Sequence, residues 1–279
     1  MRPLSRFAFI CLVFLPVAAT ACGASSSPPA AATRGGRAPA SQRQATPIAA
    51  GTCLDGTSSS ASAYAIQMRG MLADAVAGWV PPPSAHPAGA ASALPQLHFV
   101  LRSVTSTSFS TDDSTLDASI AGVAGLAPQP SPLNNPSFAS EINHWTTAKT
   151  TWQQDAAAAS RGAAALAVQV RQFHIVRGTW SGIYSCIAAA AAQLAPADGP
   201  STRLAVISDL ENNRPVAGLN LAGDAVLLVT ICPAQVATTC PQRFAAARSF
   251  LLRHGASAVT AIRADAVTAA TFDHFWGQG

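Results

Sequence analysis

Along the chain, short apolar runs alternate with stretches in which apolar residues recur every three or four positions. Apolar runs predict strands, which lie at residues 47–54, 97–104, 174–176, 204–208, 225–231 and 258–262. Apolar residues spaced three or four apart predict helices, which lie at residues 66–79, 181–194 and 241–254. A further long helix is predicted to end at Val170 and to begin at either Phe138 or Thr147. This alternation is typical of βαβ units, so we expect an α/β fold with a doubly wound, mostly parallel central sheet and helices on both faces.

The stretch around residues 81–150 departs from this pattern. Pro81-Pro82-Pro83 ends the preceding helix, and Asn134-Asn135-Pro136 is a turn signal. Between them, scattered glycines and prolines predict an irregular insertion that contains the strand at 97–104 and a short helix near residues 116–123. We therefore expect one domain over residues 47–279 that carries this insertion.

The first residues have the pattern of a secretory signal. Residues 1–21 combine a basic start, an apolar run at 7–17 and the small residues Ala19-Thr20-Ala21. Cys22 follows directly and resembles the lipidated cysteine of a bacterial lipobox, although that motif usually has leucine where Ala19 stands. Residues 22–46 are rich in Ala, Ser and Pro and predict a flexible linker. We expect an extracytoplasmic protein held at the cell membrane by a lipid on Cys22, or a freely secreted one if that cysteine is not used.

Charge excludes one class of partner. Cleavage after Ala21 removes Arg2 and Arg6, so the 17 basic residues fall to 15 against 13 acidic residues. This balance is not the basic footprint of a nucleic-acid-binding protein.

Cysteines predict disulfides rather than zinc binding. Outside the cytoplasm the cysteines of the domain can pair. Cys232 and Cys240 flank a short polar loop between a strand and a helix, so a bridge between them would close that connection. Cys53 and Cys186 are the pair left over. The chain has no Cys-x-x-Cys or His-x-x-x-His spacing, which argues against a structural zinc site.

Oxygen donors recur where predicted strands end and helices begin. Asp55-Gly56-Thr57-Ser58-Ser59 follows the first strand, Thr179 opens a helix, and Asp209 follows the strand at 204–208. In α/β sheets ligands bind beyond the carboxyl ends of the strands. Carboxylates and hydroxyls converging there suit a hard divalent cation that keeps some of its waters.

These residues resemble the von Willebrand factor type A domain and its metal-ion-dependent adhesion site. That site has the form Asp-x-Ser/Thr-x-Ser, a threonine on a second loop and an aspartate after a third strand. Asp55, Thr57 and Ser59 match the first motif, Thr179 the second and Asp209 the third. The resemblance implies a bound Mg²⁺, or Mn²⁺ or Ca²⁺ in its place, and a protein partner that offers an Asp or Glu carboxylate to the metal. It implies binding and not catalysis.

The chain departs from the family in three places. The first strand is only weakly apolar, the stretch from Ser59 to Thr179 is long, and Leu210 stands where the family has glycine after the aspartate. The threonine on the second loop has four alternatives, which are Thr105, Thr107, Thr147 and Thr150.

Other functions use the same residues. Leu54-Asp55-Gly56-Thr57 resembles half of the motif of haloacid-dehalogenase-like phosphatases, but Cys53 stands at the position of their nucleophilic aspartate. Gly178-Thr179-Trp180-Ser181-Gly182 is not the Gly-x-Ser-x-Gly motif of serine hydrolases. A metal-free scaffold domain remains a third alternative, in which the same Asp, Thr and Ser residues serve as turn and helix-cap residues.

Overall fold

The fold is taken from a computed structural model. It describes residues 45–57, 59–80, 91–105, 115–177, 181–195, 202–211, 216, 218–232 and 237–277. These residues belong to one compact unit, Gln42–Gly279. The predicted signal peptide, Cys22, nearly all of the linker, and Thr179 lie outside the described residues.

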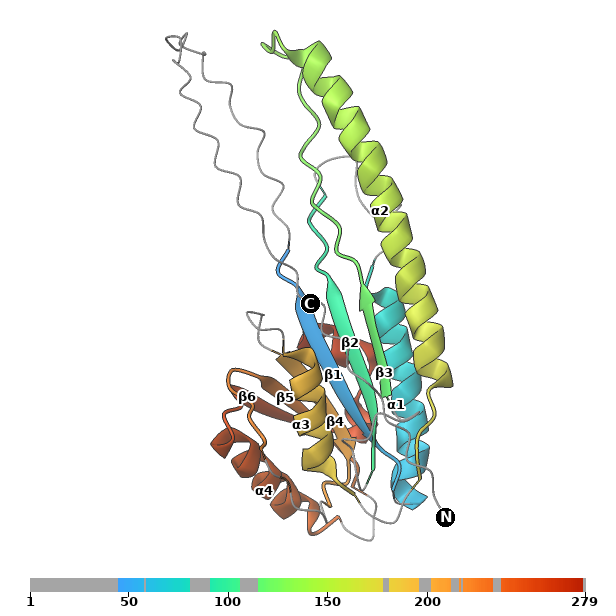
Figure 1. The fold of residues 1–279 in the computed structure, drawn as a ribbon, viewed down its shortest axis with the longest axis vertical. Helices are drawn as coiled ribbons and strands as arrows, with labels where there is room; N and C mark the ends of the chain where they lie inside the picture. Colours follow the sequence, from blue (N-terminus) through green and yellow to red (C-terminus); the bar gives the residue numbers. More distant parts are fainter. Residues whose placement is uncertain are drawn as a thin grey trace, which may run out of the picture. The chain divides into compact units, whose positions relative to one another are not determined.

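Strands and helices are interspersed along the described chain (Figure 1). The strands are β1 (Ile48–Asp55), β2 (Leu97–Val104), β3 (Thr115–Ile120), β4 (Thr202–Ser208), β5 (Ala225–Thr230) and β6 (Ala258–Arg263). The helices are α1 (Ser59–Gly78), α2 (Phe138–Gln172), α3 (Ile183–Leu194), α4 (Cys240–Arg253) and α5 (Ala269–Trp276), with a short 3₁₀ helix, Ala264–Ala266, before α5. Strand β2 is followed directly by β3, α2 by α3 and β4 by β5.

The described strands form one six-stranded sheet in the order β3-β2-β1-β4-β5-β6. All neighbouring strands run parallel except β3, which pairs antiparallel with β2 at the edge of the sheet. The order reverses at β1, which pairs with β2 on one side and with β4 on the other. The prediction of an α/β fold with a mostly parallel central sheet is therefore confirmed.

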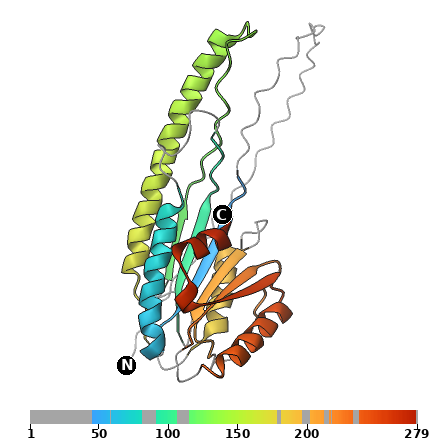
Figure 2. The same cartoon turned by 180° about the vertical axis from the view of Figure 1, so that it is seen from behind.

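Except for the edge strand β3, each strand contributes to two separate apolar cores because its side chains alternate between the two faces of the sheet. Along β1, Ala50 and Leu54 join the core that contains residues of α1, α2 and α5, whereas Ala49 and Cys53 join the core with α3 and α4. Figure 2 shows α1, α2 and α5 over the first face, and Figure 1 shows α3 in front of the opposite one. Burial on both faces explains why the central strands have nearly continuous apolar sequences.

Several predicted elements have the expected bounds. The strand at residues 97–104 coincides with β2, and the long helix begins at the earlier of its two possible starts, Phe138. Gly255 follows α4 with a φ of 98°, as expected for a left-handed residue after the helix end. No helix in the described part of the chain combines the length and apolar character needed to cross a membrane.

Two expectations are wrong, and one helix was not expected. The short helix expected near residues 116–123 is strand β3, because pairing with β2 supplies backbone partners that local propensity does not reveal. Residues 174–176 belong to no regular element. Helix α5 was not predicted, although Phe272 and Trp276 are fully buried and Trp276 packs edge-to-face on Phe99.

Candidate metal centre

The candidate centre lies where the strand order reverses. Asp55 is the last residue of β1 and Ser208 is the last residue of β4. The two strands pair in parallel, with Leu54 opposite Ile207, so both residues reach the same edge of the sheet. In sheets of this order, ligands bind in the crevice that opens at the carboxyl ends of the strands on either side of this point.

The carboxylate of Asp55 is fully buried and accepts four hydrogen bonds. Its Oδ1 accepts the backbone N–H of Thr57 at 3.0 Å and the Thr57 hydroxyl at 2.6 Å. Its Oδ2 accepts the hydroxyls of Ser181 at 3.1 Å and Ser208 at 2.6 Å. These partners are all neutral, although a buried carboxylate is costly without a compensating charge or very good hydrogen bonding.

Local sequence explains how Thr57 reaches Asp55. An aspartate that accepts the backbone N–H two residues later forms an Asx turn, and glycine is favourable between the two residues. At Gly56 a Cβ atom would lie 2.6 Å from Ile175 Cγ2 and 3.0 Å from the Val176 carbonyl oxygen. The segment after α2 therefore packs directly on the turn and leaves no room for a side chain.

Asp209 follows Ser208 and is partly buried. Burial raises the pKa of its carboxyl group above the ordinary value, and the charges of Asp55 and Glu211 raise it further. The backbone N–H of Glu211, which donates to Asp209 Oδ1 at 3.0 Å, and the charge of Arg243 act in the opposite direction. The ionised form of Asp209 is thus disfavoured in the protein alone, and a nearby cation would favour it.

Leu210 has a left-handed backbone with a φ of 59°. This conformation is uncommon for a residue other than glycine. The turn is held by Ser208, whose Oγ accepts the N–H of Leu210 at 3.0 Å while its own hydroxyl donates to Asp55. Leu210 itself is buried in the core beside α3 and α4. The backbone here therefore has the form that glycine adopts easily, and burial of the leucine side chain offsets part of the strain.

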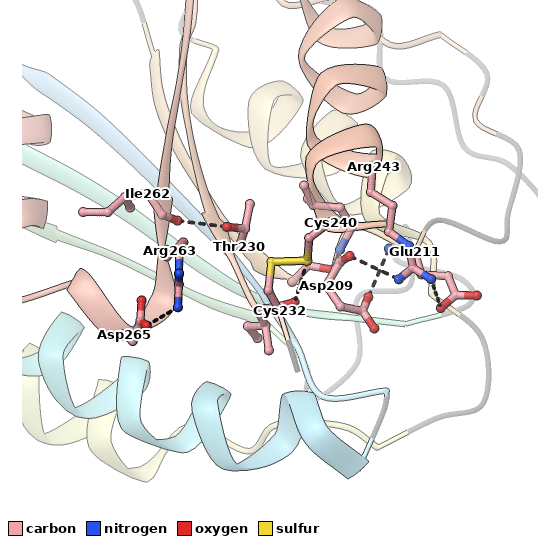
Figure 3. Close-up of a disulfide and its surroundings, with 12 residues drawn as sticks. Asp209, Glu211, Thr230, Cys232, Cys240, Arg243, Ile262, Arg263 and Asp265 are labelled. Carbon is pink, nitrogen blue, oxygen red and sulfur yellow. Dashed lines mark hydrogen bonds and ion pairs between the residues drawn. A yellow bond between two sulfur atoms is a disulfide. The ribbon is translucent and has the colours of Figure 1, made fainter. Parts of the chain in front are cut away.

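Helix α4 supports the Asp209 loop through Arg243. One guanidinium nitrogen approaches the backbone carbonyl of Asp209 at 3.5 Å, and the other lies 3.2 Å from a Glu211 carboxylate oxygen. The disulfide between Cys232 and Cys240 joins the end of β5 to the start of this helix, and Figure 3 shows Arg243 reaching from the helix toward both acidic residues. The disulfide thereby fixes the helix end from which Arg243 extends.

A second disulfide lies close to Asp55 in sequence. Cys53, two residues before Asp55, is bonded to Cys186 of α3. Helix α3 begins just after Ser181, which donates to Asp55. Both expected pairings are therefore present, and two disulfides are typical of a protein outside the cytoplasm.

The structure brings some of the predicted metal ligands together and leaves others untested. Asp55 and Thr57 are in contact, and the charge of Asp55 is close enough to Asp209 to raise the pKa of the Asp209 carboxyl group. Ser59 begins α1, but its side chain is outside the described residues, as is Thr179. Sequence reasoning did not include the hydroxyls of Ser181 and Ser208, although Ser208 stands next to a predicted ligand at a strand end.

The described donors fit a hard divalent cation. Hydroxyl and carboxylate oxygens are the ligands that Mg²⁺ and Ca²⁺ prefer. The described residues contain no group of three or more His, Cys, Asp and Glu side chains suited to a metal. The expected centre contains only two carboxylates, and its other donors are hydroxyls.

No protein-family model, curated protein or solved structure matches the chain significantly.

Proposed function

We propose that this chain is an extracytoplasmic adhesion domain of the von Willebrand factor A type. In this proposal the doubly wound domain holds a divalent cation, Mg²⁺ or alternatively Mn²⁺ or Ca²⁺, at the carboxyl ends of β1 and β4. The cation then binds an Asp or Glu carboxylate of a protein partner. The proposed metal ligands, direct or through water, are Asp55, Thr57, Ser59, Thr179 and Asp209.

One observation carries the proposal. The fully buried Asp55 carboxylate is surrounded by the hydroxyls of Thr57, Ser181 and Ser208 at the point where the strand order reverses. Two of these hydroxyls, those of Ser181 and Ser208, come from 126 and 153 residues away, which is more than a turn or helix cap requires. The left-handed Leu210 adds support, because it gives the loop the backbone expected of the glycine that the family has there.

Binding is favoured over phosphoryl transfer by the state of Cys53. A haloacid-dehalogenase-like enzyme would place its nucleophile at this position, but Cys53 is bonded to Cys186. Both oxygens of Asp55 accept hydrogen bonds from neighbouring hydroxyls, which suits a residue that orients metal ligands. The domain is proposed to be non-enzymatic.

The domain would bind its partner while it is attached to the cell membrane. A lipid on Cys22 and the linker over residues 22–46 would tether the domain outside the cytoplasm. This part of the proposal is supported by the sequence of residues 1–46 and by the two disulfides.

A thermal melt with and without metal tests the proposal. The chain from residue 22 onward, carrying Cys22→Ser, is melted in chelator and then in millimolar Mg²⁺, Mn²⁺ or Ca²⁺. Metal at about 100 times its dissociation constant stabilises the folded state by about 2.7 kcal/mol, which raises the melting temperature. Asp55→Asn and Asp209→Asn should each remove this rise, because asparagine keeps the shape of aspartate but not its charge.

Asp155→Asn is the matched control, since Asp155 is exposed on α2. It should respond to metal as the wild type does. The proposal is wrong if the wild type shows no metal-dependent rise, or if the rise persists in both site variants. In the first case the metal-free scaffold alternative would stand, and in the second the metal would bind elsewhere on the domain.

A further inference from the structure

A groove lies beside the candidate metal centre, between α1 and the segment that follows α2. Its described lining includes Ile66 and Arg69 of α1 and the residues 172–177, and its volume is about 560 Å³. The groove adjoins the metal centre because Ile175 and Val176, which line it, pack on Gly56 in the Asp55 turn.

The charges in this groove are of one sign. The ionisable side chains of its described lining are Arg69, His174 and Arg177, and none of the described lining residues is acidic. Arg69 donates through Nη1 to the Phe173 carbonyl at 2.7 Å, which fixes the guanidinium at the groove while its other N–H groups can still donate. Arg177 is exposed. A carboxylate that enters the groove would therefore meet two arginine cations and no acidic side chain of the described lining.

The groove also has an apolar side. Ile66 belongs to the apolar spacing that predicts α1, yet 49 % of its surface is exposed. It lies on the groove in the same helix as Arg69, one turn earlier. An apolar side chain of a partner could cover Ile66 while an acidic neighbour reaches the arginines.

We propose that this groove binds a short acidic segment of the protein partner whose first carboxylate is held by the metal. The inference rests on the proposed function and extends it by naming the partner's chemistry. The partner segment is extended and carries one carboxylate for the metal, a second for Arg177 and Arg69, and an apolar residue for Ile66.

The geometry sets the spacing of these groups. Ile66 lies seven residues beyond the start of α1 at Ser59, which is about 10 Å along a helix. An extended chain advances about 3.3 Å per residue. The partner's apolar residue should therefore follow the metal-binding acidic residue by about three positions, with the second acidic residue near it.

A random peptide selection tests the inference. A phage-displayed library of random peptides about a dozen residues long is selected against the chain from residue 22 onward, carrying Cys22→Ser, in Mg²⁺ and in Mn²⁺. Peptides with an apolar residue about three positions from an acidic residue, and with a second acidic residue near the pair, should be enriched. An absence of enriched peptides, or enrichment of peptides without an acidic pair, would overturn the inference.

The strongest enriched peptide is then synthesised with a fluorescent label, and its affinity is measured by fluorescence polarisation. Arg177→Glu should weaken binding by about tenfold or more, since it removes one charged hydrogen bond and adds repulsion. Ile66→Ser should weaken it less. Arg161→Glu is the control, because Arg161 is exposed on α2 about 16 Å before the groove along the helix.

The variants separate the two proposals. If Asp55→Asn abolishes peptide binding but Arg177→Glu and Ile66→Ser behave like Arg161→Glu, the groove inference is wrong and the metal-dependent function stands. If peptide binding is unchanged by chelator and by Asp55→Asn but is lost in Arg177→Glu, the proposed function fails while the groove inference is supported. A melt of Arg177→Glu in metal alone should keep the wild-type rise, which shows that the lost binding does not come from a damaged metal centre.

Discussion

Loss of the Cys53–Cys186 disulfide is expected to destabilise the domain more than loss of Cys232–Cys240. The first bond joins residues 133 positions apart and the second joins residues 8 apart. A crosslink restricts the unfolded chain more when it closes a longer loop, and the chain-entropy relation gives about 5 kcal/mol for the first bond and about 2.5 kcal/mol for the second. The larger value is a substantial part of the 5 to 15 kcal/mol that is typical of domain stability.

Urea unfolding of two double variants measures this difference. Each variant keeps one disulfide, with Cys53→Ala and Cys186→Ala in one protein and Cys232→Ala and Cys240→Ala in the other. With an m-value of about 2.5 kcal/mol per molar urea, the two midpoints should differ by about 1 M.

Packing must be separated from the crosslink, because Cys53 and Cys186 are both buried and their truncation leaves a cavity. The variant that lacks Cys232 and Cys240 is therefore also unfolded in reductant. The free energy of unfolding that this variant loses on reduction measures the Cys53–Cys186 bond while both sulfur atoms are still present. This loss should be about 5 kcal/mol. If this loss is no greater than that of the other variant on reduction, the loop-entropy reasoning is wrong.

Two further predictions concern buried positions. Burial raises the pKa of Asp224, so its contribution to stability is fully present below the unfolded pKa of about 3.9 and is lost as the pH rises through the raised folded pKa. In Asp224→Asn the melting temperature should therefore depend less on pH over this range. Asp224→Ala should destabilise the domain by about 1 to 3 kcal/mol, because the Thr202 N–H loses its acceptor. Gly56→Ala should lower the melting temperature and the metal response, since its Cβ would clash with Ile175 and the Val176 carbonyl oxygen. Gly70→Ala is the control, because a Cβ at this position in α1 meets open space, and it should raise stability by about 0.4 to 1 kcal/mol in the same melts. An equal effect of the two changes would contradict the packing described for Gly56.

Local pattern was sufficient for the elements whose neighbours in sequence decide their form. The strand over residues 97–104 is buried on both faces, so a continuous apolar run identified it. The helix predicted at residues 241–254 corresponds to α4, which has a basic residue in its last turn and is followed by the left-handed Gly255. Strand β3 was mistaken for a helix because an exposed edge strand has only a weak apolar pattern, and its pairing with β2 is a property of the fold.

Some contacts of the candidate centre also follow from local sequence, and others depend on the fold. Asp55 and Thr57 are two residues apart, so their contact follows from a turn that the sequence specifies. Ser181 and Ser208 contact the same carboxylate from 126 and 153 residues away. The chain has many other serines and threonines, and nothing in local composition distinguishes these two.

The sequence by itself determined the α/β alternation and the place of Asp55 and Asp209 at strand ends, because periodicity and local turn chemistry act over a few residues. The disulfide pairs followed from elimination among the four cysteines of the domain. Only the tertiary structure decided which hydroxyls surround Asp55 and which segment packs on Gly56 to form a cationic groove. Those contacts depend on strand order and register, which bring distant residues to one edge of the sheet. The register is fixed by burial of both faces of the sheet at once, and this physical condition involves the whole domain.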